Sequence, residues 1–169
     1  HWPAPFGLDA DPIHQIIIDD ELSKAGIRRP ANPIGIGWAG PTIMFAGTDE
    51  QKQKYILRLL SGDDFWCQLF SEPGAGSDLA NLSTKAERDG DEWVVTGQKV
   101  WTTLGHEADI GMLIARTDPS APKNKGITYF GVDLHAPGVE IRPLVHMTGE
   151  HEFNEVFLNE VRIPDLWRI

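Results

Sequence analysis

Up to about residue 62, hydrophobic residues recur at helical spacing. Asp11 and Pro12 predict the start of a helix, because aspartate caps free N–H groups and proline suits the first helical position. This helix is expected to end near Gly26. Residues 34–46 are apolar but rich in glycine and proline, so they can form a helix only if neighbouring helices bury them.

A third helix is marked more clearly. Thr48 and Gln51 fit a capping box, in which each side chain accepts a hydrogen bond from the backbone of the other residue. The buried stripe at helical spacing is expected to consist of Tyr55, Ile56, Leu59 and Leu60. Gly62 is a natural C-terminal stop. We therefore expect residues 1–62 to be the C-terminal part of an N-terminal helical domain.

After residue 63 the pattern changes to short strands separated by turns. Residues 84–88 and 92–101 flank Asp89-Gly90-Asp91 and predict a β-hairpin. Further strands are predicted at 110–116, 127–134, 139–144 and 153–163. Strands at this spacing, without helices between them, favour an antiparallel sandwich or barrel. The expected fold class is therefore α+β, with residues 63–169 forming a β domain.

Composition narrows the class of protein. The chain is 41% apolar and 24% charged, which is typical of a soluble globular protein. Fifteen basic and 25 acidic residues give a net charge of −10, which disfavours binding to nucleic acid or to an anionic membrane surface. The single cysteine, Cys67, excludes an intrachain disulfide and a cysteine metal cluster. The histidines are not at metal-ligand spacing, and no apolar run reaches the length of a membrane span.

Residues 65–80, with the sequence FWCQLFSEPGAGSDLA, form the first stretch with candidate chemistry. An apolar, strand-like run ends there in a loop of small residues. Glycine lets a ligand approach the backbone, while Ser71, Ser77 and the peptide N–H groups supply donors. Glu72 in the same loop is expected to form structural hydrogen bonds. The alternative interpretation is an ordinary strand followed by a tight turn and a helix cap.

A second stretch, residues 97–105, reads GQKVWTTLG. Trp101 at the end of a predicted strand, followed by Thr102 and Thr103, offers a flat stacking face beside hydroxyl groups. The alternative is a core tryptophan followed by two ordinary strand threonines. Taken together, the two stretches indicate a site for a planar ligand rich in heteroatoms.

Both stretches, at this separation, resemble acyl-CoA dehydrogenase, at the end of its N-terminal helical domain and in its central β domain. Residues 152–164, EFNEVFLNEVRIP, resemble the last strand of that β domain. The sequence MTGEHEFNEVF is similar to the corresponding sequence of bacterial members. The helical segment from Gly37 onwards matches as well. The resemblance therefore covers nearly the whole chain.

The resemblance implies FAD as the cofactor. It implies that Ser77 lies beside the FAD pyrophosphate and the acyl-CoA, that Trp101 packs against the isoalloxazine, and that Thr103 forms a hydrogen bond near flavin N5. The complete set of implied cofactor-binding residues is Gln68, Leu69, Phe70, Ser71, Ser77, Trp101, Thr102 and Thr103. The family usually has threonine at the position of Ser71 and asparagine near Leu104, so Leu104 receives no role.

The family reaction removes the α proton and the β hydride of an acyl-CoA to give a trans-2-enoyl-CoA. A carboxylate base takes the proton, and flavin N5 takes the hydride. The catalytic glutamate of the family lies in a C-terminal helical bundle that this sequence does not match. None of the candidate glutamates corresponds to it: Glu72, Glu107, Glu150, Glu152 and Glu155. We interpret the chain as a piece of a longer polypeptide that is inactive alone.

Partners and alternatives follow from the same resemblance. It implies an acyl-CoA substrate and an electron-transfer flavoprotein or similar acceptor. It also implies assembly into a homo- or hetero-oligomer, such as a dimer or tetramer. The implied setting is fatty acid β-oxidation in the bacterial cytoplasm. One alternative is an oxygen-reacting relative, an acyl-CoA oxidase or a flavin monooxygenase. Others are a non-catalytic flavin- or CoA-binding subunit and a β domain that serves only as an interaction module.

Overall fold

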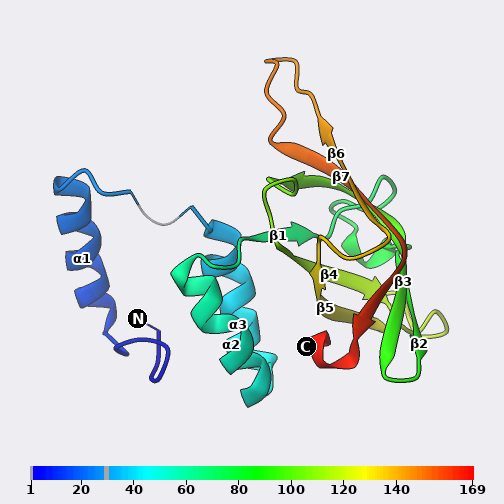
Figure 1. The fold of residues 1–169 in the computed structure, drawn as a ribbon, viewed down its shortest axis with the longest axis horizontal. Coiled ribbons are helices and arrows are strands. Elements are labelled where there is room, and N and C mark those ends of the chain that lie inside the picture. The colour runs from blue at the N-terminus through cyan, green and yellow to red at the C-terminus, as the bar shows by residue number, and fades with distance from the viewer. Residues whose placement is uncertain (1, 29–30) are drawn as a thin grey trace.

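The computed structural model describes residues 2–28 and 31–169, in which helices precede a curled β-sheet (Figure 1). The helices are α1 (Pro12–Lys24), α2 (Gly40–Ala46) and α3 (Asp49–Ser61), and a π-helical turn (Gly35–Ala39) leads into α2. The strands are β1 (Trp66–Leu69), β2 (Lys85–Asp89), β3 (Glu92–Thr103), β4 (Ile110–Arg116), β5 (Ile127–Asp133), β6 (Val139–Leu144) and β7 (Phe153–Pro164). Short 3-10 turns cover Leu79–Asn81 and Asp165–Trp167.

Helix α1 begins where its cap predicts. The side chain of Asp11 accepts hydrogen bonds from the backbone N–H groups of Ile13 (2.8 Å) and His14 (3.0 Å). The helix nevertheless buries none of its residues, and Ile16 and Ile17 are exposed. In Figure 1 it lies to the side of α2 and α3. The Asp11 cap and Pro12 thus predict the helix correctly, but they do not predict whether one of its faces is buried.

Helix α3 confirms the capping box. Thr48 N–H donates to Gln51 Oε1 (2.8 Å), and Gln51 N–H donates to Thr48 Oγ1 (3.2 Å). Of the predicted stripe, Tyr55, Ile56 and Leu59 are buried, whereas Leu60 is half-buried. Residues 34–46 are helical although they are only partly buried, with Gly40 and Ile43 inside and Phe45 94% exposed. A Cβ at Gly40 would lie 2.5 Å from the indole of Trp2.

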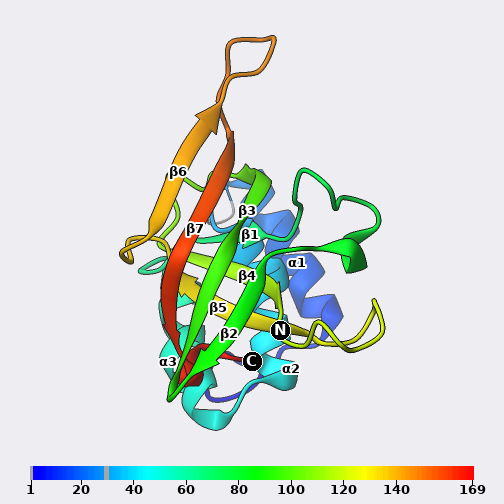
Figure 2. The same ribbon diagram turned by 90° about the vertical axis from the view of Figure 1, so that its right-hand side faces the viewer.

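The sheet follows the order β1-β4-β2-β3-β7-β6, and β5 pairs with the other side of β4. The predicted strands are present, and β2, β3, β7 and β6 lie side by side in Figure 2. The α+β fold class is confirmed, but the prediction of a purely antiparallel sheet is wrong. Strand β1 runs parallel to β4, and Lys85 of β2 pairs in parallel with Arg116. The long connection between β1 and β4, which contains the β2–β3 hairpin, permits this parallel pairing.

Two hydrophobic cores hold together the helices and strands that follow α1. One lies within the curl of the sheet, where the fully buried side chains include Leu69, Leu113, Phe130, Val156 and Leu158. The other joins α2 and α3 to the β1–β4 edge around Trp66, which is 0% exposed and meets the Tyr55 ring edge-on at 5.6 Å.

Within the described ranges, no helix combines the length and apolar content needed to cross a membrane.

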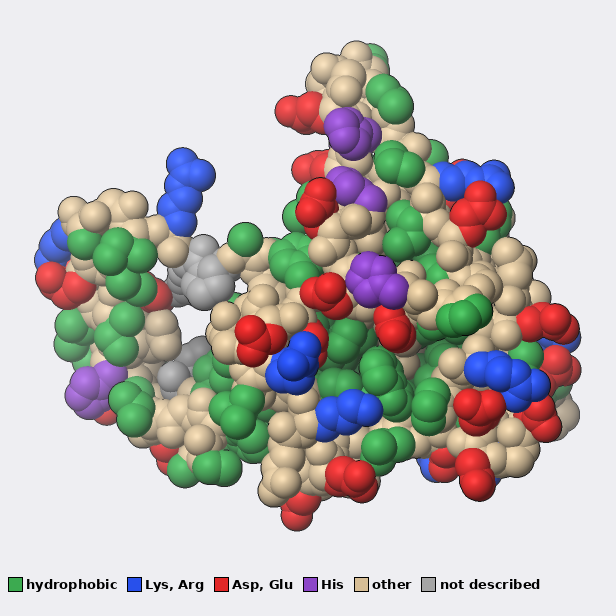
Figure 3. Space-filling model, in the orientation of Figure 1, with side chains coloured by type: hydrophobic (Ala, Val, Ile, Leu, Met, Phe, Trp, Pro, Cys, Tyr) green, Lys and Arg blue, Asp and Glu red, His purple; other side chains and the backbone are tan. Residues whose placement is uncertain are grey.

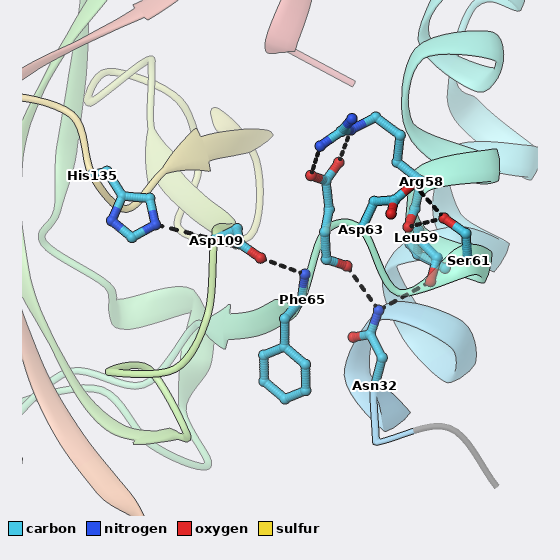
Figure 4. A network of polar contacts seen from close by, with 9 residues as sticks. Asn32, Arg58, Leu59, Ser61, Asp63, Phe65, Asp109 and His135 are labelled. Atoms are coloured by element: carbon cyan, nitrogen blue, oxygen red, sulfur yellow. Dashed lines mark hydrogen bonds and ion pairs between the residues drawn. The ribbon is translucent and has the colours of Figure 1, made fainter.

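Asn32 connects the helical segment to the sheet. Its Nδ2 donates to the carbonyls of Leu59 (3.1 Å) and Asp64 (3.0 Å), as Figure 4 shows for Leu59. Its Oδ1 accepts from the N–H groups of Gly35 (3.2 Å) and Trp66 (3.1 Å). One amide of 3% exposure thereby satisfies four backbone groups that come from three elements and a loop.

Polar side-chain contacts surround the same junction. Arg58 binds Asp64 through two hydrogen bonds (2.6 and 2.8 Å), and Asp109 accepts from the N–H of Phe65 (2.8 Å) while facing His135 (3.5 Å) (Figure 4). Arg58, Asp64, Asp109 and His135 border a hollow of about 350 Å³. Figure 3 shows hydrophobic side chains in this depression between helices and sheet, with charged groups around it. The junction therefore has an apolar floor and a polar rim.

Replacing Asn32 by alanine is expected to lower the free energy of unfolding by about 2–4 kcal/mol, because buried backbone groups lose their partners. Urea denaturation measures the change. Asn81→Ala is the matched control, because the side chain of Asn81 makes one long, exposed contact to Gly74 (3.4 Å). An equal loss in both variants would contradict the role assigned to Asn32.

Candidate functional site

The two stretches singled out in the sequence lie next to each other. The N–H of Val100 donates to the carbonyl of Ser71 (2.9 Å). The Nζ of Lys99 donates to the carbonyl of Phe70 (3.1 Å). The end of β1 is therefore attached to the end of β3 immediately before Trp101.

A buried ion pair reinforces this junction. Lys99 Nζ lies 2.9 Å from Glu72 Oε1, and the two side chains are 0% and 3% exposed. The same carboxylate accepts hydrogen bonds from Ser83 N–H and Oγ (both 2.7 Å) and from Thr84 N–H (2.9 Å). This confirms the structural role expected for Glu72. These four donors replace hydrogen bonds to water that the buried carboxylate has lost.

Burial alone would raise the pKa of Glu72. The hydrogen bonds from Thr84, Lys99 and Ser83 outweigh burial and lower the pKa from 4.5 to about 2. Burial lowers the pKa of Lys99, and the adjacent Glu72 carboxylate opposes that effect. Glu72 is therefore ionised at neutral pH.

Sequence reasoning missed Lys99 as the partner of Glu72. The signal was present, because a lysine occupies an inward position of an otherwise apolar and neutral strand segment. A charged side chain at such a position needs a buried counter-charge. What the sequence could not indicate was which carboxylate would reach it.

Beyond Lys99, strand β3 departs from regular pairing with β7. The register shifts between Lys99 and Thr102, and Trp101 (φ +61°) and Leu104 (φ +51°) both adopt the left-handed conformation. Such a conformation costs roughly 1–2 kcal/mol for a residue other than glycine. The distortion turns the Trp101 ring outward, where 60% of the residue is exposed and its edge meets Phe153 at 6.0 Å. Bulges with strained residues are typical of ligand sites.

A shallow hollow lies beside the exposed indole. It measures about 360 Å³ and is lined by Trp101, Leu144, Val145, His146 and Phe153. The His146 ring stacks on Phe153 at 4.8 Å. Flat, mainly apolar walls of this kind suit a planar ring system.

The predicted site residues differ in what they expose. Gln68, Phe70 and Ser71 are half-buried at the end of β1, whereas Ser77 and Thr103 are exposed. Leu69 and Thr102 are 0% and 1% exposed, because alternate side chains of a strand face the core. Toward a ligand on the surface, these two residues can therefore offer only backbone groups.

The small-residue loop is open. A Cβ at Gly74 or Gly76 would meet no protein atom within 4 Å, so packing within the described residues does not require glycine there. The absence of side chains instead leaves the backbone accessible. Asp78, at the far end of the loop, pairs with Lys123. This pair holds the loop against the 117–125 segment.

The Glu72→Gln variant tests the ion pair through pH. Because the folded-state pKa of Glu72 lies below 4.5, its ionisation stabilises the fold above pH 4.5, and this contribution is lost as pH falls towards 2. Urea denaturation should show the wild type about 3 kcal/mol more stable than the variant at neutral pH, with the difference shrinking below pH 4.5. The control is Glu107→Gln at an exposed glutamate. A pH-independent difference would contradict the assignment.

Leu104→Asn is expected to raise the free energy of unfolding by about 0.5–1 kcal/mol, because asparagine tolerates the left-handed conformation better than leucine. The comparison is Leu79→Asn, the same exchange at another half-buried leucine whose φ is not positive. That variant should lose stability. Equal losses at both positions would show that Leu104 is not strained.

Comparison with known proteins agrees with this geometry. A family model described as acyl-CoA dehydrogenase, middle domain, matches residues 67–161. A second, described as acyl-CoA dehydrogenase, N-terminal domain, matches residues 1–63. The first match covers both stretches of the candidate site except for Phe65 and Trp66.

Individual relatives carry the same name. The chain is 56% identical over 165 residues to acyl-CoA dehydrogenase FadE34 of Mycobacterium tuberculosis, covering 98% of this chain and 23% of that protein. A solved structure named Tcur3481-Tcur3483 steroid ACAD is 39% identical with a TM-score of 0.87, covering 99% of this chain and 43% of its own. A glutaryl-CoA dehydrogenase from Mycobacterium smegmatis in complex with FADH2 is 32% identical with a TM-score of 0.67, covering 77% and 33%.

These relatives are oxidoreductases of one family, and the chain spans less than half the length of each. More than half of the chain matches the middle-domain model, and the fold aligns along nearly its entire length with a solved member. The 169-residue chain therefore belongs to the acyl-CoA dehydrogenase family.

Proposed function

We propose that this chain forms the flavin-facing wall of an FAD-dependent acyl-CoA dehydrogenase. The observation that carries the proposal is the exposed, left-handed Trp101, held beside the open 71–78 loop by the Glu72–Lys99 pair. The domain boundary that we propose lies near residue 62, between a helical part and a β part. The FADH2 complex of the related glutaryl-CoA dehydrogenase supports the choice of cofactor.

The residues present fit a flavin. The Trp101 indole would lie against the isoalloxazine, and the exposed hydroxyl of Thr103 would form a hydrogen bond near N5. Ser71 and Ser77 would donate to the ring and to the pyrophosphate, with the open glycines beside them giving access. Gln68 and Phe70 complete the edge at the end of β1, and Leu69 and Thr102 contribute backbone groups. Bound FAD would supply the acceptor for the β hydride of an acyl-CoA.

In this proposal the chain positions the cofactor and the thioester, and the carboxylate that removes the α proton comes from another part of the enzyme. The 169 residues alone are then inactive. The related Tcur3481-Tcur3483 protein is named as a steroid ACAD with two components. Its two components support a hetero-oligomer as an alternative to a homotetramer. Its steroid substrate supports a bulky, polycyclic acyl group as an alternative to a fatty acyl group. An electron-transfer flavoprotein is the proposed acceptor.

Trp101→Ala in the intact protein that carries this sequence is expected to weaken FAD binding by about tenfold or more, because the ring loses its stacking partner. Fluorescence titration with FAD measures the dissociation constant. Trp38→Ala is the matched control, since Trp38 is 51% exposed on the π-helical turn. Equal effects of the two substitutions would contradict the proposed site.

The reaction itself is tested in the same intact protein. A steroid side-chain CoA thioester or a straight-chain acyl-CoA should bleach the flavin absorbance without oxygen, and the faster one identifies the substrate class. Rapid reoxidation by air would instead identify an oxidase. Absence of bleaching with both thioesters would contradict a dehydrogenase.

A further inference from the structure

Asn154, on β7, contacts the distorted end of β3 that follows Lys99. The residue is 0% exposed. Its Nδ2 donates to the carbonyl of Thr102 (3.0 Å) and, less closely, to that of Glu152 (3.3 Å). The first of these carbonyls belongs to the residue between Trp101 and Thr103, the two exposed side chains proposed to face the flavin.

His106 determines how the Asn154 amide is oriented. His106 Nδ1 lies 3.0 Å from Asn154 Oδ1. Because Nδ2 of the amide faces two carbonyls, the oxygen must face His106, and the imidazole must donate from Nδ1. This places a proton on Nδ1 of His106, while Nε2 lies 3.7 Å from the Glu107 carboxylate. The chain of hydrogen bonds runs from His106 through Asn154 to the backbone of Thr102.

The turn also closes tightly around Asn154. The N–H of Leu104 donates to the carbonyl of Glu152 (2.7 Å). A Cβ at Gly105 would lie 2.9 Å from Thr102 Cγ2 and 3.5 Å from the Asn154 side chain. The two left-handed residues, Trp101 and Leu104, are thus both within a segment attached to the β7 backbone and to one buried amide. Strained conformations persist only where surrounding contacts hold them in this way.

We propose that Asn154, oriented by His106, is a positioning residue for the flavin-facing turn. By holding the Thr102 carbonyl, it keeps Trp101 in its left-handed conformation and keeps the Trp101 ring and the Thr103 hydroxyl on the exposed side. The inference rests on the proposed function for its ligand, FAD. The effect of Asn154 on the position of Trp101 does not depend on FAD and is measured separately, without added flavin.

Asn154→Asp is the main test, made in the intact protein. The substitution preserves shape but removes both N–H donors and places an acceptor against the Thr102 carbonyl. Without added flavin, fluorine NMR of 5-fluorotryptophan-labelled protein, with the Trp101 signal assigned by Trp101→Phe, should show that signal moved or broadened. The dissociation constant for FAD should rise by about tenfold, the equivalent of losing a buried hydrogen bond or more.

Gln98→Glu is the matched control. It makes the same amide-to-acid exchange on the same strand pair, where Gln98 Nε2 donates to Glu155 Oε1 (3.0 Å). It should leave the Trp101 signal in place and the FAD dissociation constant within about twofold. A Trp101 signal that is unmoved in Asn154→Asp, or moved equally by Gln98→Glu, would overturn the proposal.

His106→Phe provides a second variant, in case Asn154→Asp does not fold. It leaves Asn154 in place but removes its orienting donor, and should move the Trp101 signal in the same direction with a smaller effect on FAD binding. Nitrogen NMR of the wild type should show His106 protonated at Nδ1, and protonation at Nε2 alone would overturn the assigned chain of hydrogen bonds. If the wild type binds no FAD, the proposed function fails, while the flavin-free signals still decide the positioning role.

Discussion

The buried pair between Glu72 and Lys99 is the contact on which the candidate site depends. It joins the loop after β1 to the far part of β3, the second strand of the hairpin that follows that loop. Through the Phe70 carbonyl the same lysine also fixes the last residue before the loop. A buried ion pair is weak evidence for net stability, because desolvation offsets much of its attraction. Its contribution here is to specify one arrangement of the two segments, since leaving either charge alone in the interior would be costly.

Strand β1 is held at both of its ends. Asn32 binds the N–H of Trp66 where the strand begins, and Lys99 binds the carbonyl of Phe70 just after it ends. Between these points the Trp66 side chain belongs to the core shared with α3, while Leu69 belongs to the core within the sheet. This short strand therefore transmits the position of the helical segment to the loop that the proposed cofactor would contact.

Strain at the end of β3 accompanies this rigid framework. Trp101 and Leu104 adopt a conformation that costs energy for their residue types, and the hydrogen bonds of Asn154 and Glu152 hold the segment in place. The asparagine that the family resemblance leads us to expect near Leu104 would suit this backbone, because asparagine is among the residues that tolerate the left-handed conformation best. The Asn154 side chain on β7 and the Glu152 carbonyl just before β7 hold the turn, although the strain at Leu104 remains.

Local signals in the sequence determined much of this protein. The cap at Asp11, the capping box at Thr48 and the turn at Gly90 act between near neighbours, so they predicted helix and strand limits to within a few residues. The two motif stretches led, through residue types alone, to the prediction of a planar ligand. Tertiary structure decided what depends on distant partners. It made β1 parallel to β4, left the isoleucines of α1 exposed, buried Leu69 and Thr102, and gave Glu72 its lysine. The reason is that pairing direction, burial and counter-charge are set by contacts between residues far apart in the chain, which no local pattern encodes.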